Sequence, residues 1–218
     1  RSAPFFQTHA GKMRDAIETV RQYREAVGDE VDLCIEIHRR LTPHEAIVLA
    51  RGIEPYHPFF YEDPILPDSF DAMALVAQNI QVPIATGERL HTIYEFEALL
   101  SRGAVQYVRP DVCLAGGLTG SKKIAALAEA HHVGVVPHNP LSPVSTAACL
   151  HLGAAVPGGP RRSRDARRLK DRVDIRKRRR GDPERPGRRR AGRTGVFPDP
   201  GKPPAHLHGH RLRVLRAR

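Results

Sequence analysis

Hydrophobic and polar positions follow two alternating periods over residues 1–156 of this 218-residue chain. Short apolar runs predict strands at 31–38, 58–62, 82–86, 105–109 and 133–136. Between them, apolar residues at helical spacing predict helices over about 12–27, 92–101 and 119–130. Two further helices are expected after the capping box Thr42-Pro43-His44-Glu45 and after Asp68-Ser69. Strands that alternate with helices through short links indicate right-handed βαβ units and a parallel sheet.

A parallel sheet is either covered by helices on both faces or closed into a barrel. A doubly wound sheet that binds a dinucleotide would carry a Gly-rich fingerprint after its first strand, and this chain has none. The pattern therefore favours the barrel. The predicted fold class is α/β, an incomplete TIM (β/α)8 barrel over residues 1–156.

Each predicted strand ends in a polar residue that a plain core strand would not carry. These residues are Glu36, Glu62, Glu88, Asp111 and His138, separated by 26, 26, 23 and 27 positions. One βα unit of a barrel takes about 25–30 residues, so the five recur once per unit at the carboxyl ends of successive strands. Barrel enzymes build their active sites on that face. The spacing therefore predicts an active site.

The residue types suggest metal-assisted acid–base chemistry. Three converging carboxylates without a Cys ligand suit a hard divalent cation, Mg2+ before Zn2+, which would also offset their mutual repulsion. Asp111 and His138 end adjacent strands, so a hydrogen bond between them is feasible and would make His138 a general base. His38 lies two residues after Glu36 and is a second candidate acid/base. A cation beside a base can remove a proton α to a carboxylate, because the cation stabilises the enediolate.

Two arginines, Arg39 and Arg40, follow the first of these strands. They either meet a substrate carboxylate or form an exposed pair in a loop. The three cysteines Cys34, Cys113 and Cys149 show no metal-binding spacing and fit reduced thiols in a cytoplasm. No apolar run approaches the roughly 18 residues of a membrane span, and no signal peptide is visible. A cytoplasmic protein without a membrane partner is expected.

Charge divides the chain at residue 156. Residues 1–156 carry 13 Lys+Arg against 18 Asp+Glu, whereas residues 157–218 carry 22 against 6, a net charge of +16. The second part is rich in Arg, Pro and Gly and has no hydrophobic period, which predicts a disordered tail. Its charge would bind phosphates, but no aromatic residues are interleaved to stack on bases, so nucleic acid is not the expected partner.

The strand-end residues lie within longer motifs that resemble the enolase superfamily, in its mandelate racemase/muconate lactonizing enzyme branch. Within it, the chain is most similar to galactonate-dehydratase-like sugar-acid dehydratases. The motifs cover about residues 4–157 and occur in the family's order: Glu36-Ile37-His38-Arg39-Arg40, Tyr61-Glu62-Asp63-Pro64, Thr86-Gly87-Glu88-Arg89-Leu90, Arg109-Pro110-Asp111, Ala115-Gly116-Gly117 and Pro137-His138-Asn139-Pro140.

The resemblance implies a role for each strand-end residue. Glu36, Glu62 and Glu88 would bind Mg2+, the Asp111–His138 dyad would remove the C2 proton, and His38 would act as general acid on the departing 3-hydroxyl. The product of a sugar-acid (aldonate) substrate would be a 2-keto-3-deoxy acid. Substrate-binding residues are unknown, and full-length relatives are expected to be homo-oligomers. A racemase or cycloisomerase of the same superfamily stays open as an alternative.

Three departures from the family pattern affect this expectation. The first metal ligand is Glu36, where the family more often has Asp. The chain starts beyond the family's N-terminal capping domain and its first two barrel strands, so residues 1–156 correspond to about units three to seven. The eighth strand, which should end in Glu, is replaced by the Arg/Pro/Gly-rich sequence 157–218. A shifted reading frame is the favoured interpretation of that tail, a nucleic-acid-binding arm is the other, and the departures argue against activity of this chain alone.

Overall fold

The computed structural model describes residues 8–156 and 213–217. Its elements, in chain order, are α1 (His9–Val27), β1 (Asp32–Glu36), α2 (Pro43–Ile53), the 3-10 helix η1 (Glu54–Tyr56), β2 (Phe60–Glu62), α3 (Phe70–Gln78), β3 (Ile84–Thr86), α4 (Ile93–Leu100), β4 (Tyr107–Val108), α5 (Gly117–Ala130), β5 (Gly134–Val135), α6 (Pro143–Ala155) and β6 (Arg213–Ala217). All five predicted strands and all five predicted helices are present. Helix α6 is additional, and most of the basic tail, residues 157–212 and 218, lies outside the described residues.

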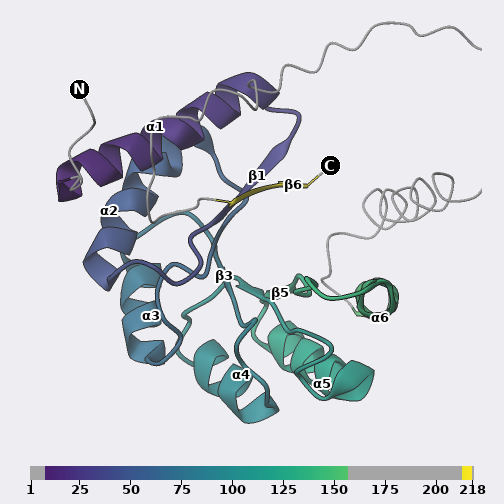
Figure 1. Ribbon diagram of the computed structural model, residues 1–218. Coiled ribbons are helices and arrows are strands. Elements are labelled where there is room, and N and C mark those ends of the chain that lie inside the picture. Colours follow the sequence, from purple (N-terminus) through teal and green to yellow (C-terminus); the bar gives the residue numbers. More distant parts are fainter. Residues whose placement is uncertain (1–7, 157–212, 218) are drawn as a thin grey trace, which may run out of the picture.

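The strands form one sheet in the order β5-β4-β3-β2-β1-β6. Strands β1 to β5 pair as parallel neighbours in chain order, as successive units of a barrel do. Helices α1 to α5 follow one another in an arc outside this sheet (Figure 1). The arrangement confirms the α/β fold and the partial barrel predicted from the sequence.

Polar side chains fix the start of most helices. Thr42 and Thr92 each form a capping box, in which the threonine accepts the N–H of a glutamate three residues later and that glutamate accepts the threonine N–H. Ser69 and Ser142 cap α3 and α6 through their hydroxyls. These caps start the helices directly after the strand-end loops, and so they set the length of each loop.

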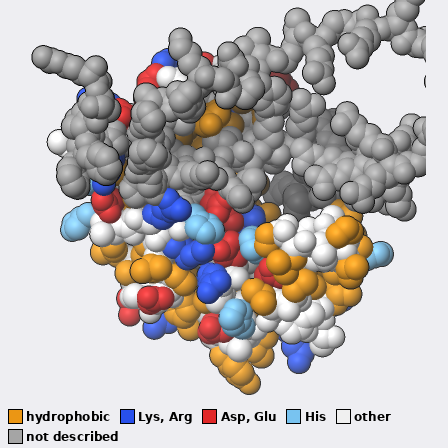
Figure 2. Space-filling view, in the orientation of Figure 1, with side chains coloured by type: hydrophobic (Ala, Val, Ile, Leu, Met, Phe, Trp, Pro, Cys, Tyr) orange, Lys and Arg blue, Asp and Glu red, His pale blue; other side chains and the backbone are white. Residues whose placement is uncertain are grey.

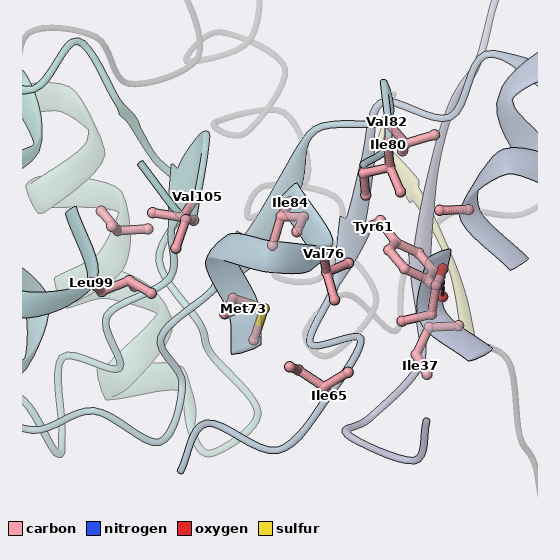
Figure 3. Packing of buried hydrophobic residues seen from close by; sticks show 14 of the residues in the cluster. Ile37, Tyr61, Ile65, Met73, Val76, Ile80, Val82, Ile84, Leu99 and Val105 are labelled. Carbon is pink, nitrogen blue, oxygen red and sulfur yellow. Dashed lines mark hydrogen bonds between the residues drawn. The ribbon is translucent and has the colours of Figure 1, made fainter. Parts of the chain in front are cut away.

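The core has two layers because side chains of a strand alternate between its faces. Leu33 and Ile35 of β1 belong to the large cluster under the helices, part of which Figure 3 shows around Tyr61, Met73 and Ile84. Cys34 belongs to a smaller cluster on the opposite face, together with Phe60 and Ala85. The same alternation places the carboxylates that end β1 and β2 on this inner face.

Five residues of the tail form a strand that the sequence pattern did not predict. Strand β6 pairs antiparallel with β1, with Asp32 opposite Ala217 and Glu36 opposite Arg213. This pairing satisfies backbone groups on the edge of β1 that β2 leaves free. In the part of the chain that the structure describes, no helix is long and apolar enough to cross a membrane.

Candidate active site

The five strand-end residues lie along one edge of the sheet. Glu36 and Glu62 are register partners at the ends of β1 and β2, and Glu88 follows β3 by two residues. Asp111 and His138 form an isolated parallel bridge beyond the ends of β4 and β5. Acidic, basic and histidine side chains gather beside one another in the middle of the face seen in Figure 2. The predicted convergence at the carboxyl ends of the strands is therefore present.

The expected contact between Asp111 and His138 is formed. Nδ1 of His138 lies 3.0 Å from Oδ2 of Asp111, and Nε2 of His138 lies 2.8 Å from Oε2 of Glu88. The other oxygen of Asp111, a buried side chain, accepts the N–H of Cys113 at 2.8 Å. Burial lowers the pKa of His138, but the hydrogen bonds to Glu88 and Asp111 raise it further, so the net shift is upward. The imidazole is thus held between two carboxylates.

Glu88 is the most heavily paired of the three glutamates. Its Oε1 pairs with Nη1 of Arg39, and its Oε2 with His138. Burial raises its pKa, but these two cationic partners outweigh burial and bring the pKa down to about 2. Arg39 also reaches Asp63, whose Oδ2 is 2.8 Å away. Both oxygens of Glu88 are therefore occupied by donors of the chain.

Asp63, the residue directly after β2, supports this arrangement. Its side chain is buried, and its Oδ1 accepts the hydroxyl hydrogen of Thr86 at 2.6 Å. Burial raises the pKa of Asp63, against the lowering effect of Thr86 and Arg39. Asp63 was not predicted as a site residue; its signal was its place directly after Glu62 in the motif Tyr61-Glu62-Asp63-Pro64.

Glu62 pairs with a buried arginine that the sequence did not single out as functional. Nε of Arg109 lies 2.6 Å from Oε1 of Glu62, as an ion pair without a directed hydrogen bond, and its guanidinium lies over the ring of Phe60. Burial raises the pKa of Glu62 to about 7; the Arg109 charge opposes the shift, and the charges of Asp63, Glu36 and Glu88 add to it. The three predicted metal ligands are thus close enough to repel one another.

His38 lies at the rim of the site. Its side chain is half exposed, and its Nδ1 lies 2.8 Å from Oε1 of Glu36. His38 has a left-handed backbone, with φ of 59°, as does Arg39, with φ of 64°. The residue is therefore placed beside the first expected metal ligand, accessible to a small molecule, and its role as a general acid stays a prediction.

The carboxylates at the strand ends are suitable ligands for a hard cation, although basic side chains of the chain itself already pair with them. Oε2 of Glu62 is buried and has no hydrogen-bond partner among the described residues. Oxygen donors from three neighbouring strand ends are the ligands that Mg2+ prefers. Within residues 8–156, however, no group of three or more His, Cys, Asp and Glu side chains stands ready to hold a metal ion. Arg39, Arg109 and the two histidines take the carboxylate oxygens instead.

The raised pKa of Glu62 predicts a pH-dependent stability without divalent cations. Its pKa is about 7 in the folded chain and 4.5 ordinarily. Protonation of Glu62 therefore stabilises the folded chain. This contribution to the free energy of unfolding is complete below pH 4.5 and is lost as the pH rises to 7. We expect the free energy of unfolding in EDTA to fall by about 3 kcal/mol over that range. Urea denaturation at several pH values measures it.

Glu62→Gln should flatten this pH dependence, because glutamine does not titrate. The matched control is Glu129→Gln, which alters an exposed glutamate of α5 and should leave the slope as it is. An unchanged slope in the Glu62→Gln chain would contradict the assignment.

This chain is similar to proteins of a known family. A family model described as enolase C-terminal domain-like matches residues 4–187. The D-galactonate dehydratase of Cronobacter sakazakii (strain ATCC BAA-894) is 40% identical over 141 residues, which are 65% of this chain and 37% of that protein. The family match extends past residue 157, where the sequence motifs end, so the domain boundary at 156 stays a prediction.

Solved structures of related proteins are also similar to this chain. An enolase from Agrobacterium radiobacter, bound to Na and L-malate, is 33% identical with a TM-score of 0.68, over 72% of this chain and 40% of that one. The 3,6-anhydro-D-galactonate cycloisomerase of Zobellia galactanivorans is also 33% identical, with a TM-score of 0.64, over 66% of this chain and 41% of that one. This chain spans about two fifths of the length of these relatives.

Proposed function

Because this chain belongs to the enolase C-terminal domain-like family, we propose that it carries the proton-abstracting site of a Mg2+-dependent sugar-acid dehydratase. The reaction is the conversion of an aldonate to a 2-keto-3-deoxy acid. The observation that carries the proposal is the hydrogen-bonded Asp111–His138 pair at the strand ends, beside three neighbouring carboxylates. The similarity to a D-galactonate dehydratase supports the substrate class.

Asp111 acts on the substrate only through His138. Its carboxylate accepts from Nδ1 and so leaves Nε2 as the nitrogen that takes up a proton. Since Nε2 lies 2.8 Å from Glu88, this nitrogen points toward an expected metal ligand. A sugar acid that takes the place of Glu88 beside Nε2 would present the proton on its α-carbon to this nitrogen.

Glu36, Glu62 and Glu88 would hold the cation. Mg2+ bound there would supply the positive charge that lowers the cost of removing a proton α to a carboxylate. The unpartnered Oε2 of Glu62 supports this assignment, because a buried carboxylate oxygen without a partner is costly. His38, half exposed beside Glu36, would protonate the leaving hydroxyl.

Mg2+ should stabilise the chain through this site. At a concentration about 100 times its Kd, a ligand that binds only the folded state adds about 2.7 kcal/mol to the free energy of unfolding. Thermal denaturation with and without MgCl2 measures the effect. Glu62→Gln should abolish it, whereas Glu129→Gln should retain it. A native chain whose Tm does not respond to Mg2+ would remove the metal from the proposal.

The reaction itself is tested with D-galactonate and Mg2+ in D2O. We expect deuterium at C2 of the recovered substrate and a 2-keto-3-deoxy acid as product, both visible by NMR. The structural similarity to a cycloisomerase supports one alternative within the family. A cycloisomerase or racemase would give a product without loss of water, and His38→Ala would then leave α-proton exchange intact. No exchange and no product would contradict both assignments.

A further inference from the structure

Arg39 joins two carboxylates from different strands at the centre of the site. Its Nη1 pairs with Oε1 of Glu88 and lies 2.8 Å from Oδ2 of Asp63. The side chain of Arg39 is only 16% exposed, and its two partners are less exposed still. The sequence suggested an exposed loop arginine or a ligand for a substrate carboxylate, whereas the structure has its guanidinium bound to the chain's own carboxylates.

The backbone holds Arg39 in this position at a conformational cost. A left-handed φ of 64° is uncommon for a residue with a side chain and persists only where its surroundings impose it. Here the N–H of Arg39 donates to the carbonyl oxygen of Asp63 at 2.7 Å, and the side chain returns to the carboxylate of the same residue. Backbone and side-chain contacts therefore fix the guanidinium beside Glu88.

This position puts Arg39 in direct competition with a metal ion. His138 and Arg39 each take one oxygen of Glu88, so a cation that binds this carboxylate comes next to one of them and must displace it or bear its repulsion. His138 can lose its charge by giving up a proton, but an arginine stays charged at any pH the protein tolerates. Of the two partners of Glu88, Arg39 is therefore the one whose repulsion of a bound cation cannot be relieved by loss of a proton.

We propose that Arg39 is an internal counter-ion that neutralises Glu88 in the metal-free chain and yields this carboxylate when a divalent cation binds. The inference rests on the proposed metal site. Asp63 keeps Arg39 paired after it leaves Glu88, because Nη1 contacts both carboxylates. Arg39 thus sets the affinity for the cation. It reduces the repulsion among the carboxylates of the site, and it weakens metal binding because it competes for Glu88.

The experiment compares Mn2+ binding to the full native chain and to Arg39→Gln by titration calorimetry. We expect Arg39→Gln to bind Mn2+ about tenfold more tightly, since one ionic contact no longer has to be broken. The same variant should have a lower Tm in EDTA, because Glu88 and Asp63 lose their common partner. Arg102→Gln is the matched control: it removes an exposed arginine paired with Asp71 and should leave the Mn2+ affinity unchanged.

A second pair of variants keeps the test decisive should Arg39→Gln fail to fold. Asp63→Asn removes the buried charge that Arg39 neutralises, and the double variant Asp63→Asn/Arg39→Gln should still bind Mn2+ about tenfold more tightly than Asp63→Asn alone. Equal or weaker affinity after loss of Arg39 would overturn the counter-ion role and leave the metal site intact. Absence of Mn2+ binding in the native chain and in every variant would instead overturn the metal site, and the inference with it.

Discussion

Replacing His138 by asparagine should lower the rate of α-proton exchange on an aldonate by about 10²–10⁴-fold, the contribution typical of a positioned general base. Asparagine preserves polarity and approximate size but cannot take up the proton that Nε2 receives. Exchange of the C2 proton with D2O, followed by NMR in the presence of Mg2+, measures the rate. His132→Asn is the control, because His132 is an exposed histidine whose left-handed φ of 57° asparagine tolerates.

The pH dependence of the same rate tests the environment of His138. The hydrogen bond to Asp111 raises the pKa of His138. The exchange rate should rise with pH as the imidazole loses its proton and becomes able to accept one. Asp111→Asn removes a partner that raises the pKa, and it should shift the rise to lower pH while it lowers the maximum rate. Exchange at the native rate in the His138→Asn chain would contradict the assignment of the base.

Gly87→Ala should destabilise the chain by about 2–5 kcal/mol, the combined size of backbone strain and overpacking. Gly87 has φ of 130°, which residues with a side chain rarely adopt. A Cβ built there would lie 2.7 Å from Cε1 of the buried Phe96 and 3.2 Å from the backbone nitrogen of Arg109. Urea denaturation measures the loss. The same substitution should weaken Mn2+ binding, because residue 87 directly precedes Glu88.

Gly153→Ala provides the contrast. Gly153 lies within α6, and a Cβ built there meets nothing within 4 Å. Alanine should therefore stabilise the chain by about 0.5–1 kcal/mol through its higher helix propensity. A Gly87→Ala chain as stable as the native one would show that the turn before Glu88 can relax, contrary to the packing described above.

The sequence predicts those parts of the fold that a regular spacing or a local motif determines. The spacing of Glu36, Glu62 and Glu88 follows from the length of a βα unit, and Thr42 marks a helix start through a local contact with Glu45. Helix α6 was missed because its only buried residues are Ser145 and Leu152, so no apolar stripe marks it. Strand β6 depends on a free edge elsewhere in the chain, which no local pattern reveals.

The sequence predicted which strand-end residues lie together, but it predicted less of how their side chains pair. Asp111 and His138 meet because they end adjacent strands, a consequence of topology that the spacing already contains. The contacts of Arg39 with Asp63 and Glu88 span 24 and 49 positions and depend on a left-handed turn after β1. Side-chain pairing across strands depends on the strand register and on the backbone conformation. Residue type alone determines neither the register nor the conformation.

Strand β6 adds one long-range pairing to the sheet. Strands β1 to β4 each pair with the next strand along the chain, whose paired residues lie 22 to 27 positions away. Closing each of these loops costs less entropy than closing a much longer one. Asp32 and Ala217 pair across 185 positions, the widest separation in the sheet. Until β6 is in place, the outer edge of β1 lacks the backbone partners that β6 supplies. An open strand edge is a template for pairing with another copy, so slow formation of this long-range pair would favour aggregation.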